Sequence, residues 1–300
     1  MPKQCPLCEG VGHDEGLNGQ VPLLRCEGCG FVYADAADDD VDRANFHYDH
    51  DTVEEYRRIQ SGYDVAWFDW TAKRLARGTA GGRVLDIGCG NCLLLQSFER
   101  IGWLCYGLDP SPWAAKCGQQ RGYTVYRTAA DVPAEAFDLV VATSTLEHVA
   151  RPRELAAFAL RCLRKGALSY WTIPNYGSVS LRLHLAELPP QPTPMHCVFF
   201  TGQTLRRLFT SPGIAEEVEW VKVRSYGLPE LYKVWKRMRL RRPMTQVPDA
   251  APAATDQGDD KRLALARSLR AKAVVRSYYW LGRPFLWGDK LEAIVKKADR

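Results

Sequence analysis

The residues with the clearest chemical potential lie in the stretch RVLDIGCGNC, where an apolar segment leads into a turn with two glycines. Asp86 precedes Gly88 and Gly90, and a second carboxylate, Asp109, ends the apolar segment CYGL nineteen residues after Gly90. A glycine turn lets the backbone approach a ligand without a Cβ in the way. Carboxylates at the ends of neighbouring strands are typical of ligand binding at the carboxyl edge of a parallel sheet. The pattern therefore predicts a cofactor site on that edge.

The chemistry of this turn argues against a dinucleotide. The dinucleotide fingerprint needs a third glycine three residues after the second, and Leu93 occupies that position. The Asp86 carboxylate would also repel a diphosphate, whereas it would attract a cation. S-adenosylmethionine fits, because it carries a sulfonium and an α-amino group and no phosphate. The alternative is a generic α/β crossover whose strand-end acids only solubilise the chain.

A second chemical signal lies in the first residues, where two Cys-x-x-Cys pairs stand seventeen residues apart: Cys5 with Cys8, and Cys26 with Cys29. Four thiolates bind one tetrahedral zinc and leave no open position for catalysis. So short a segment cannot bury enough apolar surface to fold alone, so the metal would substitute for a core. Disulfides are the alternative, but ten cysteines and no apolar signal segment favour a reduced, cytoplasmic protein. We call this cysteine-rich segment the zinc ribbon, and it either recognises a ligand or braces the rest of the chain.

The elements that position these residues alternate between strands and helices. Helices are expected at 92–101, at 112–121 and over RELAAFALRCLRK, and the alternation predicts a parallel sheet with right-handed crossovers. The expected strands, in chain order, are RVLDI, CYGL, TVYR, FDLVVA, ALSYWTIP, EEVEWVKVRSYG and GDKLEAIVKKA. The sequence contains no run of eighteen apolar residues that would span a membrane.

Two segments flank this alternation. Residues 34–51 are acidic and poor in apolar residues, which favours a linker, and the aromatic segment that follows has helical spacing, so it either covers the cofactor or packs on the sheet. Near the carboxyl end, residues 228–286 form a basic helical insertion. Residues 220–300 contain nineteen Lys and Arg against eight Asp and Glu, a surplus of eleven in a chain of net charge +5. This charge suggests an anionic substrate or surface, or else a solvated basic face.

The segments VLDIGCGNC, GLDPS, FDLVVATSTLEHV and LRKGALSYWTIPN resemble, in order and spacing, the class I S-adenosylmethionine-dependent methyltransferases, in the branch with Leu-Glu-His-Val after the fourth strand. The resemblance covers roughly residues 84–209. It implies an α/β fold with a Rossmann-like seven-stranded sheet over 81–300, whose last, antiparallel strand follows the helical insertion. A zinc ribbon at 1–33 and an acidic linker with cap helices at 34–80 complete the chain. The cofactor-binding residues that the resemblance implies are Asp86, Gly88, Cys89, Gly90, Asp109, Pro110, Ala129, Thr143 and His148.

The roles that the resemblance implies differ along the cofactor. Asp86 and the two glycines would line the methionine end, and Asp109 would hold the ribose hydroxyls. Thr128 stands where the family often has an acid near the adenine amine, so the backbone of Ala129 would serve there instead.

The acceptor side centres on His196. The stretch PMHCVFFTGQTLRRLF resembles the His-x-x-aromatic-Phe-Ser/Thr segment of many relatives, including zinc-binding sugar C-methyltransferases that begin it with Tyr-His-Glu-His. Only His196 of those four residues is retained here. An imidazole titrates near neutral pH, so we expect His196 to act as general base, or alternatively to order its loop through backbone hydrogen bonds. Ubiquinone-type relatives place a metal-binding Glu-x-x-Glu-His at STLEH, but Ser144 replaces the first glutamate and leaves only Glu147 and His148.

These observations predict O-methylation of a small-molecule acceptor of glycan, lipid or natural-product type. Sugar C-methylation is the runner-up, and a non-enzymatic cofactor-binding scaffold is a weaker alternative. An RNA-base methyltransferase is less favoured, because Lys3 and Arg25 are nearly the only cations of the ribbon and RNA readers need basic grooves. The expected partners are the acceptor, anionic or lipid-linked, and an anionic surface that contacts the basic insertion.

Overall fold

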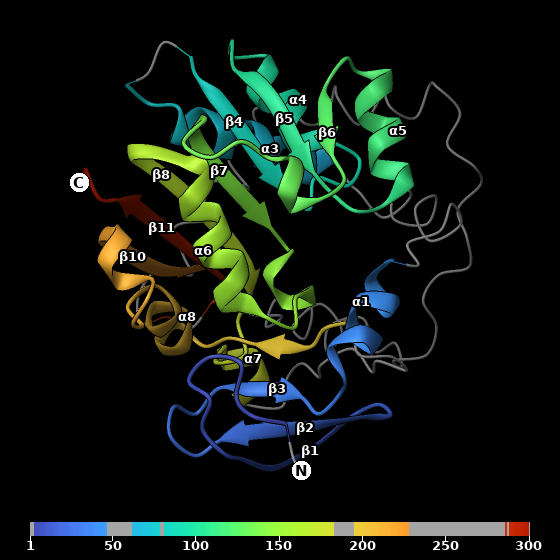
Figure 1. The fold of residues 1–300 in the computed structure, drawn as a ribbon, viewed down its shortest axis with the longest axis vertical. Helices are drawn as coiled ribbons and strands as arrows, with labels where there is room; N and C mark the ends of the chain where they lie inside the picture. The colour runs from blue at the N-terminus through green and yellow to red at the C-terminus, as the bar shows by residue number, and fades with distance from the viewer. Residues whose placement is uncertain are drawn as a thin grey trace, which may run out of the picture.

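The large sheet is the framework of the molecule (Figure 1). The computed structural model describes residues 3–46, 62–78, 81–182, 195–227, 286 and 288–299. Seven strands lie in the order β10-β11-β8-β7-β4-β5-β6, and only β11 runs antiparallel to its neighbours. This is the expected Rossmann-like α/β fold, including its antiparallel last strand. The strands are β4 (Arg83–Ile87), β5 (Leu104–Leu108), β6 (Thr124–Tyr126), β7 (Phe137–Thr143), β8 (Leu163–Pro174), β10 (Val218–Tyr226) and β11 (Lys290–Lys297).

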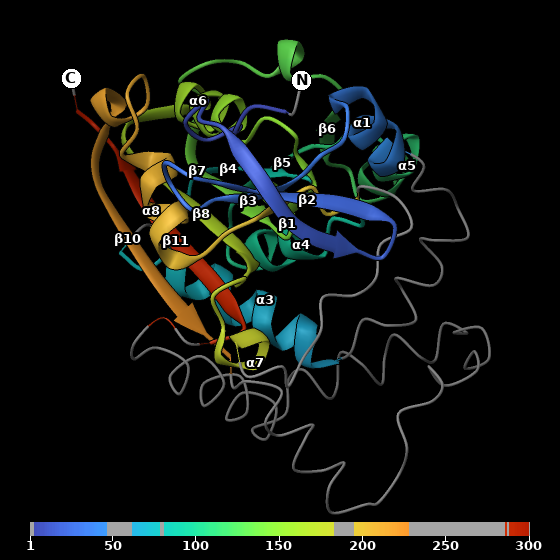
Figure 2. The same cartoon turned by 90° about the horizontal axis from the view of Figure 1, so that it is seen from below.

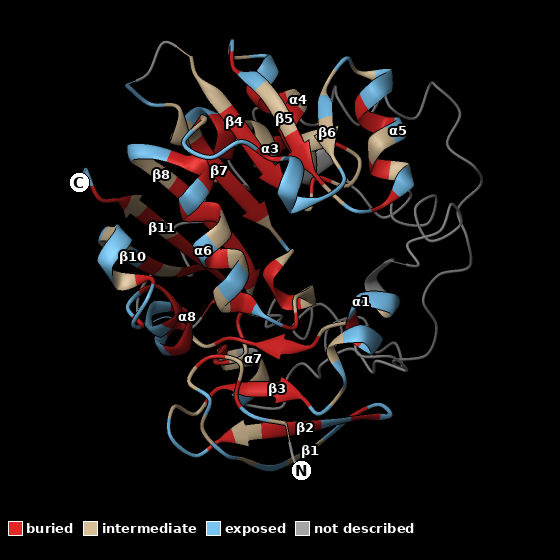
Figure 3. Cartoon of the chain, viewed as in Figure 1, coloured by how far each residue is buried: buried red, intermediate tan, exposed pale blue. Residues whose placement is uncertain are grey.

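Helices cover both faces of this sheet, so its central strands are buried on both sides (Figure 3). Apolar side chains of α3 (Gly62–Leu75), α4 (Leu93–Glu99) and α5 (Pro112–Gln120) pack in one cluster, with Val84 and Val141 of the sheet. Those of α6 (Pro152–Cys162) and α8 (Gly202–Phe209) pack in the other, with Leu85 and Val140. The helix α6 ends earlier than expected, because β8 begins directly at Leu163, which pairs with Phe137.

Local signals explain where two of these helices begin. In α5, the Ser111 side chain accepts a hydrogen bond from the backbone N–H of Ala114 at 3.1 Å, and a proline occupies the first turn. In α8, Thr201 and Thr204 form a reciprocal capping box. Shorter elements complete the domain, namely the helix α7 (Val179–Arg182) and the 3₁₀ turns η1 (Ala129–Asp131), η2 (Leu146–His148) and η3 (Ala215–Glu217).

The cysteine-rich segment forms a second, small antiparallel sheet of β1 (Gly12–Asn18), β2 (Val21–Cys26) and β3 (Val32–Ala34). Its fourth strand, β9 (Val198–Phe199), comes from a much later part of the chain and pairs with β3. Seen from below, the small sheet lies in front of the large one (Figure 2). Apolar residues of both sheets belong to one buried cluster, so the ribbon and the large domain share a core.

The structure corrects the interpretation of residues 34–51 as a linker, since α1 (Asp38–Phe46) is a helix. Its first turn carries three aspartates, whose negative charge is favourable at a helix N-terminus. Asp38 also pairs with Lys3 at 2.9 Å and Arg151 at 2.7 Å. One apolar residue, Val41, is fully buried. The acids therefore stabilise and anchor a helix that the composition alone did not indicate.

Part of the expected organisation lies outside the described residues. The basic insertion at 228–286 is represented only by Leu286, and the first part of the aromatic segment, residues 52–61, is likewise not described. Among the helices that the structure does describe, none combines the length and the apolar character needed to cross a membrane.

Candidate active site

A cavity of about 680 Å³ opens where β4, β5 and β7 end. A volume of this size suits a ligand as large as a nucleoside cofactor. Every expected cofactor residue except Ala129 lies along its wall. Those lining residues are Asp86, Gly88, Cys89, Gly90, Asp109, Pro110, Thr143 and His148.

The glycine turn is held open by the second carboxylate. Gly88 and Gly90 both have positive φ, 73° and 45°, which only glycine adopts readily. The N–H of Gly90 donates to Oδ2 of Asp109 at 3.0 Å, while Oδ1 of Asp109 accepts from the N–H of Ser111 at 2.9 Å. Asp109 therefore shapes the turn and also presents its carboxylate to the cavity.

Asp86 is the most unusual group in the cavity wall. Its side chain is only 2% exposed, and its Oδ1 has no hydrogen-bond partner. Burial, together with the nearby charges of Cys92 and Asp109, raises the pKa of this carboxyl well above its ordinary value. A cationic group in the cavity would offset that cost and favour the ionised form.

Ala129 is the one expected residue that does not line this cavity, and its contact with the adenine end stays a prediction. It begins the 3₁₀ turn η1, is exposed, and its carbonyl accepts a hydrogen bond from Arg161 at 3.2 Å. The hydroxyl of Thr128 donates to Asp131 at 2.8 Å, which closes the turn on itself. Ala129 is consequently absent from the residues that line the cavity.

Other parts of the chain contribute wall residues that the sequence motifs did not indicate. From α1 come Asp42 and Arg43, and from α3 comes Phe68; the remainder lie near the motifs themselves. The additional lining residues are Asn91, Leu93, Leu94, Ser111, Trp113, Ser144, Thr145 and Val149. The residues that closely follow a strand, such as Asn91, Ser111 and Ser144, could have been predicted from that position. No local sequence pattern marks Asp42 and Arg43 as wall residues.

The helix α3 has two roles, and each matches one of the two expectations for the aromatic segment. Phe68 lines the cavity, while Trp67 stacks on Tyr226 with ring centroids 4.7 Å apart. About two turns further on, Arg74 binds the buried carboxylate of Glu292 at 2.8 Å. Different side chains of the same helix therefore line the cavity and pack on the sheet.

Next to the cavity, Glu147, His148 and His196 gather, each with one polar atom within 4.8 Å of the others. The rings of His148 and His196 meet edge to face at a centroid distance of 4.6 Å. Nδ1 of His148 donates to the carbonyl of Met195 at 3.0 Å. His148 lines the cavity, and His196 lies one ring further from it, outside the lining residues.

Burial sets the protonation of this group. It lowers the pKa of His148 to about 3, with the charge of His196 as a second cause. Burial also lowers the pKa of His196, with Lys290 as a second cause, so both imidazoles are neutral at pH 7. The pKa of Glu147 is raised to about 7 by full burial, and its Oε2 has no hydrogen-bond partner. Neutral imidazoles can accept a proton.

The same three side chains are a poor fit for a metal ion of the kind that the Glu-x-x-Glu-His pattern implies. Ser144 stands in place of the first carboxylate and lines the cavity. The positive charge of Lys290 acts on Glu147, His148 and His196 alike, and it competes with any cation placed among them. No metal is therefore given a role in the chemistry at this position.

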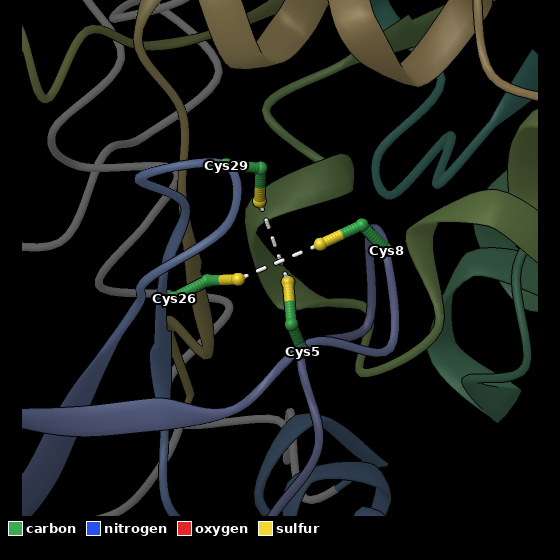
Figure 4. A group of neighbouring side chains, drawn as sticks. All are labelled: Cys5, Cys8, Cys26 and Cys29. Atoms are coloured by element: carbon green, nitrogen blue, oxygen red, sulfur yellow. Dashed lines mark hydrogen bonds between the residues drawn. The ribbon is translucent and has the colours of Figure 1, made fainter.

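The four ribbon cysteines, in contrast, fit a metal well. Their sulfurs point toward one centre (Figure 4), with 3.7 Å between Cys5 and Cys29 and 3.5 Å between Cys8 and Cys26. In a tetrahedral zinc site with Zn–S of about 2.3 Å, the sulfurs lie about 3.8 Å apart. A Cβ at Gly10 would lie 3.1 Å from the Cys26 sulfur, so the chain leaves room for this cluster.

Comparison with known proteins identifies the large domain. A family model described as a methyltransferase domain matches residues 55–215, more than half of the chain. The chain belongs to this family. It therefore contains an S-adenosylmethionine-dependent methyltransferase domain, and the cavity at the strand ends lies within the matched region.

Curated relatives of this methyltransferase domain include ubiquinone biosynthesis O-methyltransferases. The one from Rhodopseudomonas palustris is 40% identical over 103 residues, which are 32% of this chain and 39% of the relative. The one from Nitrobacter winogradskyi is 34% identical over 176 residues, 52% of this chain and 66% of the relative. The alignment with the former spans about two fifths of that protein's length.

Among solved structures, the plantazolicin methyltransferase BpumL in complex with SAH aligns with a TM-score of 0.52 and 16% identity. The alignment covers 86% of this chain and 96% of that one. At this identity the likeness extends to the fold alone, and it agrees with the Rossmann-like sheet described above.

Proposed function

We propose that this protein is an S-adenosylmethionine-dependent methyltransferase that O-methylates a small-molecule acceptor. The observation that carries the proposal is the buried carboxylate of Asp86, whose Oδ1 has no hydrogen-bond partner, beside a glycine turn in a chain of the methyltransferase-domain family. The choice of oxygen is supported by relatives named ubiquinone biosynthesis O-methyltransferase. Those alignments cover part of each protein, so the acceptor itself is inferred by class only.

In this proposal, each wall residue binds a different part of the cofactor. Asp86 binds the cationic methionine end, where a positive charge compensates its burial. Gly88 and Gly90 allow close approach of the backbone, and Asp109 accepts hydrogen bonds from the ribose hydroxyls. When bound, S-adenosylmethionine supplies an electrophilic methyl group, so that a C–O bond to the acceptor forms as the C–S bond breaks.

His196 is the proposed general base for the acceptor hydroxyl. It is neutral at pH 7. Its ring contacts His148, which lines the cavity and whose pKa of about 3 makes it a weak base, so His196 lies at the acceptor edge of the cavity. Aligning the hydroxyl with the methyl group supplies most of the acceleration, because orientation alone is worth about 7–11 kcal/mol. The base then removes the proton that the acceptor loses.

The ribbon cysteines are proposed to hold one structural zinc. Four sulfur ligands leave no open coordination position, so the metal would stabilise the fold without joining the transfer. The anionic or lipid-linked character of the acceptor rests on the surplus of eleven positive charges in residues 220–300.

The test is methyl transfer from labelled S-adenosylmethionine to a panel of phenolic and catechol acceptors, sugar nucleotides, isoprenoid-linked phenols and RNA. We expect label in the small hydroxyl compounds, with the methyl group on oxygen by NMR. Label on a sugar carbon would favour the sugar C-methyltransferase alternative, and label in RNA alone would overturn the proposal.

Once an acceptor is found, single-turnover rates test His196. We expect His196→Ala to slow transfer by roughly 10²–10⁴-fold with cofactor affinity intact. His13→Ala, an exposed histidine on β1, is the matched control and should leave the rate unchanged. Near-full turnover of the His196 variant would show that another group accepts the proton.

A further inference from the structure

We propose that the metal-loaded ribbon is a positioning device for the acceptor side of the active site. The segment that it positions, residues 195–200, carries His196 and is called here the acceptor segment. The role given to His196 rests on the proposed function above. The contacts that carry the inference are backbone pairings and ring contacts on both sides of this segment.

On its ribbon side, the acceptor segment is bound as a strand. Val198 and Phe199 form β9 and pair with Tyr33 and Val32 of β3. The N–H of Ala34 donates to the carbonyl of Cys197 at 2.8 Å, directly after His196. The backbone beside the proposed base is therefore part of the ribbon sheet.

On its other side, the same segment is bound to the cavity wall. The N–H of Cys197 donates to the carbonyl of Glu147 at 2.9 Å, and the carbonyl of Met195 accepts from His148. His148 in turn lines the cofactor cavity. The acceptor segment is thus a bridge, with the ribbon at one edge and the cofactor site at the other.

Side chains reinforce the bridge close to the metal ligands. Phe31, two residues after Cys29, contacts Phe200 with ring centroids 4.6 Å apart, and both rings are fully buried. Glu15 of β1 accepts a hydrogen bond from the hydroxyl of Tyr176 at 3.3 Å. The metal ligand Cys29 and the contact residue Phe31 are only two positions apart. Loss of the metal should therefore release the acceptor segment as well as the ribbon.

The surroundings of the ribbon favour bracing over recognition of nucleic acid. An open groove of about 840 Å³ lies between the ribbon and α6, and its walls mix basic and acidic side chains. Two of its basic side chains pair with acids of the same groove: Lys3 with Asp38 at 2.9 Å, and Arg153 with Glu9 at 3.5 Å. A groove neutralised in this way lacks the positive surface that a phosphate backbone needs.

Hydrogen exchange of the full-length, zinc-loaded protein tests the inference without an acceptor. In Cys26→Ser, we expect the amides of residues 197–200 to exchange at least about tenfold faster. Without its metal the ribbon is no longer ordered, so the acceptor segment can open without first breaking its pairing with β3. The amides of Gly88 and Gly90 and the affinity for S-adenosylmethionine, measured by calorimetry, should stay within about twofold. Leu17→Ser, an exposed ribbon position, is the control and should change neither.

A second variant keeps the metal and breaks the bridge. Ala34→Pro removes the N–H that Cys197 accepts, so it should speed exchange at 197–200 while zinc content remains one per chain. Unchanged protection of 197–200 in Cys26→Ser, once its zinc is lost, would overturn the inference. Equal loss of protection at Gly88 and of cofactor affinity would overturn it too, since the metal would then support the whole domain. Neither readout depends on methyl transfer, so failure of the proposed function would be recognised separately.

Discussion

Replacing Gly88 by alanine tests the reasoning about the cofactor turn most directly. A Cβ at this position would lie 2.7 Å from Cγ2 of Thr145 and closer still to its Oγ1. Thr145 cannot easily withdraw, because its hydroxyl donates to the carbonyl of Ile87 at 2.9 Å. The backbone is also left-handed at Gly88, with φ of 73°.

The overlap with Thr145 and the left-handed backbone together determine how much Gly88→Ala should lower the free energy of unfolding. A non-glycine residue in the left-handed region costs about 1–2 kcal/mol, and forcing extra atoms into packed surroundings costs about 1–3 kcal/mol. Gly88→Ala should therefore lower the free energy of unfolding by roughly 2–5 kcal/mol. It should also weaken S-adenosylmethionine binding, since the turn that lines the cavity must shift.

Gly90 provides a matched control within the same turn. It too has positive φ, 45°, but a Cβ there would meet only Cζ3 of Trp113, at an ordinary 3.8 Å. Gly90→Ala should therefore show only the backbone cost, about 1–2 kcal/mol.

Urea unfolding of the full chain measures both variants, and calorimetry measures their cofactor affinity. Adding Thr145→Ala to Gly88→Ala should relieve the overlap, so the double variant should be more stable than the sum of the two single changes predicts. We expect a coupling energy of at least about 1 kcal/mol. If Gly88→Ala proves no more destabilising than Gly90→Ala, the argument from Thr145 is wrong.

Three further predictions concern single groups. Asp109→Ala should abolish measurable S-adenosylmethionine binding in calorimetry, because the N–H groups of Gly90 and Ser111 lose their acceptor along with the ribose contact; unchanged affinity would refute the assignment. Elemental analysis should find one zinc per chain and none in Cys26→Ser, and retention of metal by that variant would exclude the ribbon site. Burial raises the pKa of Glu147 from 4.5 to about 7. Its contribution to stability is therefore full below pH 4.5 and is lost as pH rises to about 7. Glu147→Gln cannot ionise, so between pH 4.5 and 8 it should gain up to about 3 kcal/mol relative to wild type in urea unfolding. A difference that stays constant with pH would contradict this reasoning.

The large sheet was predictable because its signals are local. Each strand has an apolar run of its own, and glycine or proline follows most of them, so order and direction followed from the alternation with helices. The residues of the cavity wall were predictable for the same reason, since Asp86 and Asp109 mark the ends of adjacent strands. Eight of the nine expected residues lie along one cavity, and the exception, Ala129, begins the exposed turn η1.

The acceptor side and the ribbon contact were not predictable in the same way. The strand β9 has two residues, and its partner β3 lies more than 160 positions earlier in the chain. So short a pairing leaves no periodicity for a sequence pattern to report. The helix α1 was missed because the burial of Val41 and ion pairs from Lys3 and Arg151 outweigh its acidic composition.

The cofactor cavity and the proposed acceptor side are built from different parts of the chain, so acceptor specificity could change while the cofactor cavity stays the same. Most of the proposed cofactor half of the site lies at the ends of β4, β5 and β7, which fold together with the sheet core. The acceptor half depends on segments far apart in sequence: residues 29–34 of the ribbon, Glu147 and His148, residues 195–200, and Lys290. Substitutions on the ribbon strand β3 can therefore move His196 without disturbing Asp86 or Asp109. On the proposed roles, a ribbon built into the acceptor wall would let one cofactor site serve different acceptors through changes on β3, which lies more than fifty positions before Asp86 in the sequence.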